Sequence, residues 1–160
     1  METDGDEICL RSHDSQPPVT MASTLLTAWC LLAVTVTIHA AGLSTMLRRA
    51  SPPANTRFWP VTRLFVWVAW WLLVLHLAEV SVWALFYWWQ KCLPDAESSF
   101  YFSGVTYATL GYGDLVLPHE WRLLGPIEGL TGILMCGLST GFFFAVLSKF
   151  LVAKSASEQD

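Results

Sequence analysis

The residues of this chain best suited to chemistry form one short run, Thr106-Tyr107-Ala108-Thr109-Leu110-Gly111-Tyr112-Gly113-Asp114. An extended peptide normally points successive carbonyl oxygens to alternate sides, so bringing them to one side requires unusual dihedral angles. Gly111 and Gly113 permit such angles, because glycine adopts positive φ without a Cβ clash. Carbonyl oxygens aligned in this way are ligands for a cation that has lost its water.

The run resembles the signature of the potassium-channel pore family, T-x-x-T-x-G-Y-G-D. The likeness covers about Leu72–Leu151 and is nearest to small prokaryotic channels with one pore loop per chain and an extra helix in front. It implies a selectivity filter at Thr109–Gly113, where K⁺ is coordinated by carbonyl oxygens of Thr109, Leu110, Gly111 and Tyr112. It also implies that Tyr112 points away from the ion and braces the strand against the preceding pore helix.

The resemblance assigns support of the filter to Asp114 at its outer mouth and to Thr106 and Tyr101 on the pore helix. Two positions depart from the family's pattern. Val105 stands where some members carry a carboxylate that holds the filter aspartate, and Tyr101-Phe102 replaces a pair of tryptophans. Because Phe102 donates no hydrogen bond, the sequence leaves the partner of Asp114 open.

A single pore loop cannot close around an ion. A ring of carbonyl oxygens requires four copies, so we expect a homotetramer with cyclic symmetry. The expected partners are K⁺, membrane lipid and further copies of the chain, with no cofactor besides the permeant ion. The net charge of −4 provides no basic field for nucleic acid.

The composition indicates that these residues sit in a membrane protein. Of 160 residues, 54% are hydrophobic and 14% are charged, whereas about a quarter are charged in soluble domains. Three stretches are long and apolar enough to cross a bilayer, namely Met21–Leu47, Leu64–Gln90 and Gly129–Ser148. We therefore predict an all-α membrane protein with three transmembrane helices, a re-entrant pore helix and a filter loop, assembling as a tetrameric channel.

The predicted organisation has seven segments. They are a polar, acidic extracytoplasmic tail (1–20), transmembrane helix 1 (21–47), a basic cytoplasmic loop (48–60), transmembrane helix 2 (61–90), the pore helix, filter and outer loop (91–125), transmembrane helix 3 (126–152) and a cytoplasmic tail (153–160). The pore helix is expected at about Glu97–Ala108, with Asp95 and Glu97 near the positive end of its dipole. Its negative end would then favour a cation.

The distribution of Lys and Arg predicts the orientation. Six of these residues lie in the loop between the first two spans, at the start of the second span and after the third span, and three lie on the opposite side: the six are Arg48, Arg49, Arg57, Arg63, Lys149 and Lys154. Basic residues favour the cytoplasmic side. We expect a multi-pass protein of the cell membrane with its N-terminus and the segment Lys91–Arg122 outside and its C-terminus in the cytoplasm.

Glu79 lies in the middle of a span, where a bare carboxylate is costly. His76 is on the same helical face, so the two are predicted to form an intramembrane polar pair, with the pore helix or inner helix as other sources of a partner. Two interpretations stay open: a satisfied buried group, or a proton-sensitive brace on the filter. A metal site is disfavoured, because one His and one Glu do not fill a coordination sphere.

Two glycines of the inner helix, Gly132 and Gly137, match positions where family members often bend. The alternatives are a gating hinge and close packing against another helix. Glu128, near the start of this helix, is expected to act like a cap. A disulfide between Cys9 and Cys92 is a further open alternative.

The function that follows from these patterns is passive conduction of dehydrated K⁺ by a homotetramer. Two alternatives are a weakly selective cation channel and a non-conducting subunit of a larger membrane complex; a membrane metalloenzyme is a third. The chain has no Walker loop, G-x-S-x-G or H-E-x-x-H motif, so we expect no enzyme. The sequence leaves the gating stimulus open, and we hypothesise that pH acts through Glu79 and His76.

Overall fold

The structure is a computed structural model that describes residues 20–49 and 58–157. Over these residues it is all-helical. The helices are α2 (Met21–Arg49), α3 (Phe58–Trp89), α4 (Ala96–Tyr107), the 3-10 turn η1 (His119–Trp121) and α5 (Leu124–Ser157). The predicted all-α class is confirmed, with three long helices and a short one between the second and third.

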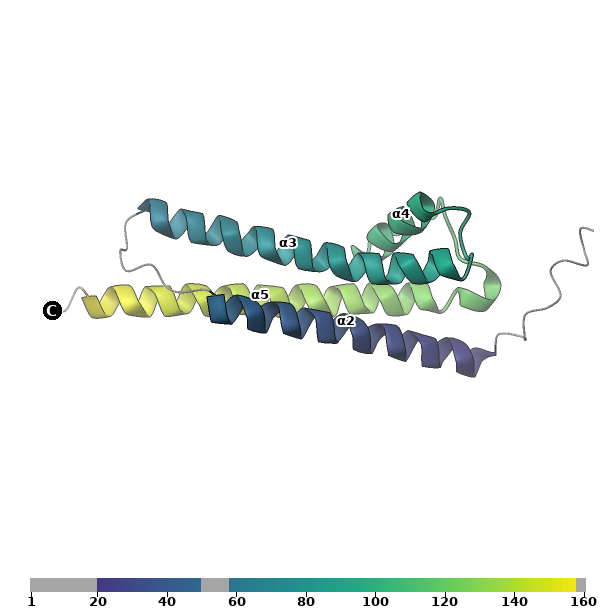
Figure 1. The fold of residues 1–160 in the computed structure, drawn as a ribbon, viewed down its shortest axis with the longest axis horizontal. Helices are drawn as coiled ribbons and strands as arrows, with labels where there is room; N and C mark the ends of the chain where they lie inside the picture. Colours follow the sequence, from purple (N-terminus) through teal and green to yellow (C-terminus); the bar gives the residue numbers. More distant parts are fainter. Residues whose placement is uncertain (1–19, 50–57, 158–160) are drawn as a thin grey trace, which may run out of the picture.

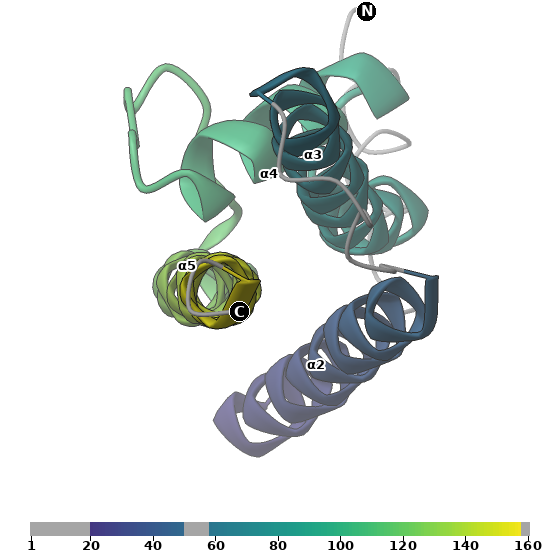
Figure 2. The same ribbon diagram turned by 90° about the vertical axis from the view of Figure 1, so that its left-hand side faces the viewer.

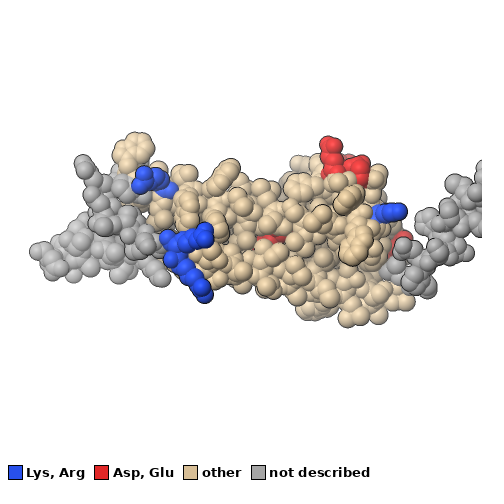
Figure 3. Space-filling view, in the orientation of Figure 1, with Lys and Arg blue, Asp and Glu red and all other residues tan. Residues whose placement is uncertain are grey.

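The three long helices are suited to cross a membrane. Segments of 29, 29 and 30 residues meet the requirements of length and apolarity: Met21–Arg49, Val61–Trp89 and His119–Ser148. At about 1.5 Å per residue each exceeds the roughly 30 Å hydrocarbon core. Figure 3 shows most of the visible Lys and Arg at one end of the molecule, acidic residues with a further basic side chain at the other, and a wide band between them almost without charge.

The short helix α4 lies against the C-terminal half of α3 and the N-terminal half of α5 (Figure 1). Helix α2 packs on α3 and α5. Seen along the bundle in Figure 2, the loop that follows α4 projects away from α2. The first span is therefore peripheral to that loop.

Local sequence explains where α4 begins and ends. Asp95 has an extended backbone, and its carboxylate accepts hydrogen bonds from the Ser98 N–H at 2.7 Å and the Ser98 hydroxyl at 3.0 Å. This is an N-cap, and the hydrogen bond from the Ser98 backbone lowers the pKa of Asp95. The helix ends before Thr109, whose φ of 61° lies in the left-handed region.

A buried cluster holds the end of the bundle that carries α4. Its largest members are Trp83 and Tyr87 of α3, together with Leu93, Leu117 and Trp121 from the segments on either side of α4 and its loop. Leu117 and Trp121 thereby secure the chain where it returns from the loop to α5. The loop itself stays outside this core.

Several predicted boundaries differ from the observed ones. Helix α3 begins at Phe58, inside the predicted loop 48–60, and α5 runs to Ser157, inside the predicted tail 153–160. The segment Ala153–Ser157 contains no Gly or Pro to stop a helix. The predicted tail as far as residue 19, loop residues 50–57 and Cys9 lie outside the described residues, so the proposed disulfide stays a prediction.

Candidate functional site

The loop after α4 has an unusual backbone. Gly111 has φ of 55° and Gly113 has φ of 78°, in agreement with the expectation of positive φ at both glycines. Thr109 also has positive φ, which is rare for a β-branched residue and was not foreseen from the sequence. Rare backbone conformations of this kind gather at functional sites.

Backbone hydrogen bonds hold the start of this loop. The backbone N–H groups of Leu110 and Gly111 donate to the carbonyl oxygen of Val105, at 2.9 and 3.4 Å. Among the described residues, no hydrogen bond ends on the carbonyl oxygens of Thr109 to Tyr112. Residues 108–114 of the loop are all exposed. Carbonyl oxygens at membrane depth need a partner, and among the described residues these oxygens have none.

The loop begins beside the third span. A Cβ added at Gly132 would lie 2.0 Å from the carbonyl oxygen of Tyr107, and one added at Gly129 would lie 3.4 Å from that of Thr106. The C-terminal turn of α4, which includes the predicted support residue Thr106, is thus held against α5. Gly132 is required by this close approach, whereas Gly137 has nothing within 4 Å of its added Cβ. Bending at either glycine stays a prediction.

Tyr101 supplies the hydrogen bond that the sequence left open at the end of the loop. Its hydroxyl donates to Asp114 Oδ2 at 2.8 Å, and this bond raises the pKa of Tyr101. Asp114 Oδ1 accepts from the Leu115 N–H at 3.1 Å. Tyr112 was expected to brace the strand on the pore helix, but its side chain is 67% exposed in the single chain. The bracing role of Tyr112 stays a prediction.

Two buried carboxylates hold α4 in place. The hydroxyl of Ser103 donates to Glu128 of α5, and the hydroxyl of Tyr107 donates to Glu79 of α3. Glu128 also accepts from the Tyr87 hydroxyl at 2.7 Å. The cap-like role expected for Glu128 is wrong: its side chain is fully buried and binds α3 and α4, because its face of α5 is turned toward both helices.

Glu79 stands at the centre of a larger cluster than the predicted pair. His76 Nδ1 lies 3.3 Å from Glu79 Oε2, and His39 Nδ1 of α2 lies 2.7 Å from Glu79 Oε1. Ser139 of α5 lies beside both imidazoles. Sequence analysis missed His39 as a member. The available signal was that His39 is the one histidine in the first charge-free stretch.

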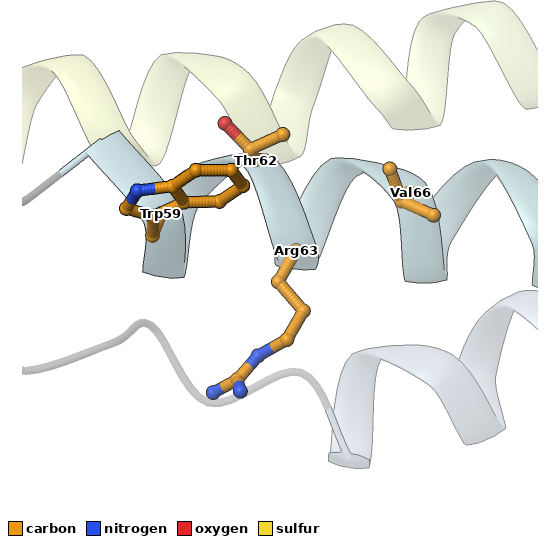
Figure 4. A pocket seen from close by; sticks show the side chains of 4 residues that line it. All are labelled: Trp59, Thr62, Arg63 and Val66. Atoms are coloured by element: carbon orange, nitrogen blue, oxygen red, sulfur yellow. The ribbon is translucent and has the colours of Figure 1, made fainter.

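One surface pocket lies on α4 and includes the predicted support residue Tyr101 in its lining, whereas another lies far from the site. Figure 4 shows the latter pocket, of about 390 Å³, on the outer side of α3 at the end opposite α4. It is lined by Trp59, Thr62, Arg63 and Val66, all from two turns of one helix. Its lining is that of a helix end near a membrane interface, and none of the predicted site residues lies in it.

Comparison with known families covers most of the elements described above. A family model described as "Ion channel" matches residues 62–149, more than half of the chain. The match runs through α3, α4, the loop and most of α5, and it leaves α2 outside. No curated protein and no solved structure matches the chain significantly. With three helices able to span a membrane and this match, the chain is a multi-pass membrane protein that belongs to the ion-channel family.

Proposed function

We propose that this ion channel conducts K⁺ selectively, and that Thr109–Gly113 form its filter. The observation that carries the proposal is the set of unpartnered carbonyl oxygens from Thr109 to Tyr112 on a loop whose glycines have positive φ. Backbone carbonyls in this role replace the hydration shell of the ion. The Thr109 hydroxyl adds the innermost ligand.

The electrostatics around the loop favour a cation. Helix α4 ends at Tyr107, immediately before the loop, so its partly negative end lies next to the proposed ion path. Asp114 places a carboxylate at the other end of the loop, held by Tyr101. Both features lower the energy of a positive ion relative to a negative one.

Four copies of the chain complete the ring. A single loop offers its oxygens from one side only. Large apolar residues in and next to the proposed filter are exposed in the single chain, namely Leu110 (58%), Tyr112 (67%) and Val116 (66%). Helix α5 carries a stripe of exposed apolar residues at helical spacing, namely Leu130, Ile133, Leu134, Leu138 and Phe144. A cyclic homotetramer covers these surfaces around a shared axis, with α2 on the outside.

The proposed orientation follows the charges of the described residues. Arg48 and Arg49 lie in the last turn of α2 and Arg63 lies near the start of α3, at the end of the bundle away from α4 (Figure 1). Asp95 and Glu97 lie at the start of α4. The positive-inside rule places the arginines in the cytoplasm. The filter loop and the start of α2 then face outward across the cell membrane.

Reconstitution of the purified chain alone tests the proposal. Vesicles with K⁺ on one side and Na⁺ on the other should show a reversal potential close to that of K⁺, and Ba²⁺ should block the current. Tyr112→Asp, which keeps the glycines, should lose selectivity but not conduction. Equal permeability to K⁺ and Na⁺ in the unaltered chain would indicate a weakly selective pore. Absence of flux would indicate a non-conducting subunit.

The oligomeric state has a separate test. Native mass spectrometry of the protein in detergent should give four chains per particle. A monomer or dimer that still conducts K⁺ would contradict the proposed ring, because neither closes around an ion.

A further inference from the structure

We propose that His39, His76 and Glu79 form a binding site for a divalent transition-metal ion of the Zn²⁺ type, inside the membrane and separate from the filter. One donor atom from each of the three residues lies within 4.8 Å of the others. The residues come from two helices, α2 and α3. The objection that one His and one Glu do not fill a coordination sphere no longer applies, because α2 contributes the second imidazole.

The spacing of the donor atoms fits one ion. Tetrahedral Zn²⁺ binds N and O ligands at about 2.0–2.2 Å, which places neighbouring ligand atoms roughly 3.3 Å apart. His76 Nδ1 is 3.3 Å from Glu79 Oε2, and His39 Nδ1 is 2.7 Å from Glu79 Oε1, so each imidazole faces a different oxygen of the carboxylate, with one donor atom of each residue within 4.8 Å of the others. The Tyr107 hydroxyl, 3.0 Å from His76 Nδ1, keeps its hydrogen bond to Glu79, and the fourth position is left to water, as in Zn²⁺ sites with three protein ligands. A small outward movement of His39 accommodates the ion.

Ser139 supplies the outer contact that metal-bound imidazoles require. Its hydroxyl oxygen lies 3.0 Å from His76 Nε2 and 3.4 Å from His39 Nε2. A hydroxyl oxygen has two acceptor sites, so it can accept from both Nε2–H groups at once. That tautomer leaves both Nδ1 lone pairs directed toward Glu79. Fixing the tautomer of a ligating His from its other nitrogen is the usual arrangement in metal sites.

The charge of the cluster also calls for a cation. Glu79 is fully buried, and its ion-pair partners among the described residues are His39 and His76, with no Lys or Arg. The Glu79 carboxylate lies at a depth where charge is costly. A bound divalent ion offsets it. The His76 side chain is 20% exposed, which gives the ion a point of entry.

Metal binding to the purified full-length chain, without an affinity tag, tests this inference. Equilibrium dialysis with Zn²⁺ followed by elemental analysis should give one ion per chain. Co²⁺ in its place should give the visible absorption of a four-coordinate site. His39→Ala and Glu79→Gln should abolish stoichiometric binding, and Ser139→Ala should weaken it by about 10- to 100-fold. His119→Ala, a change on the exposed turn η1, is the matched control and should bind like the unaltered protein.

Binding of less than stoichiometric Zn²⁺ by the unaltered chain, or equal binding by His39→Ala, would overturn the inference. If His39→Ala does not fold, the Co²⁺ spectrum of the unaltered protein and the His76→Gln variant decide the matter. The readout is independent of ion flux. A chain that binds Zn²⁺ but passes no K⁺ supports the metal site and contradicts the proposed conduction. A chain that passes K⁺ but binds no Zn²⁺ contradicts the metal site and supports the proposed conduction.

Discussion

The hydroxyl of Tyr107 donates a hydrogen bond to the buried carboxylate of Glu79, and so ties the last turn of α4 to the middle of α3. One turn earlier, Ser103 makes the same kind of bond to Glu128 of α5. The two donors are four residues apart and therefore share one face of α4. The position of the proposed filter, Thr109–Gly113, thus depends on two carboxylates that lie outside it.

Tyr107→Phe should destabilise the protein and loosen the filter. The change removes one donor to a buried carboxylate, which costs about 1–3 kcal/mol for the group left unsatisfied. Thermal unfolding of the purified protein measures the first effect, and the ratio of K⁺ to Na⁺ permeability measures the second.

A double-mutant cycle with Glu79→Gln is the control for this prediction. If the bond carries the effect, the two changes together should cost less than the sum of the single changes. Simple additivity would indicate that the two side chains do not interact.

Gly132→Ala should prevent α4 from packing correctly on α5. The new Cβ would stand 2.0 Å from the carbonyl oxygen of Tyr107, and this backbone atom cannot move aside without displacing α4. Gly137→Ala is the matched change on the same helix, in open space. It should keep the fold or stabilise it by about 0.5–1 kcal/mol, since Ala is the better helix former.

The measurement is the thermal unfolding of each variant and its yield of folded protein. A Gly132→Ala protein as stable as the unaltered chain would show that the close approach of α5 to Tyr107 is wrong. A loss of stability in Gly132→Ala but not in Gly137→Ala would also favour packing over bending as the reason for glycine at position 132.

Tyr101→Phe should shorten the time for which the filter conducts. It removes the hydroxyl that donates to Asp114 at 2.8 Å and leaves the ring in place. Because both side chains are exposed in the single chain, the effect on folding should be small. Tyr101→Trp, which retains an N–H donor, should restore part of the loss. Recordings of sustained K⁺ current measure this, and identical decay in all three proteins would contradict it.

The elements of the fold could be predicted from the sequence more fully than the contacts between buried side chains. The filter run and the charge-free spans are local patterns, so they placed α4, the three spans and the positive φ of both loop glycines without knowledge of packing. The match to the ion-channel family confirms the predicted membership. The roles of Thr109–Gly113 and the tetramer stay predictions that the geometry supports.

Contacts between distant segments could not be read in this way. His39 reaches Glu79 across 40 positions of the chain, and nothing near either residue specifies how α2 is rotated against α3. Glu128 resembled a cap because of its place near a helix start, while its partners lie on two other helices. Thr109 adopts positive φ although its β-branched side chain disfavours it. Each outcome depends on the assembled bundle.

Acid should weaken the start of α4. The Ser98 N–H lowers the pKa of Asp95 below its ordinary value, so the charged cap stabilises the folded protein above about pH 4. This contribution is lost as the pH falls through the folded pKa. Asp95→Ala should therefore unfold at a lower temperature than the unaltered protein at about pH 7, and the difference should shrink at about pH 3.

Asp95→Asn separates the cap from its charge. Asparagine accepts the same hydrogen bond but does not titrate, so its stability relative to Asp95→Ala should be independent of pH over this range. The difference in unfolding temperature between pairs of variants cancels the titration of the other carboxyls. If the gap between the unaltered protein and Asp95→Ala were the same at both pH values, Asp95 would not cap α4 as a carboxylate.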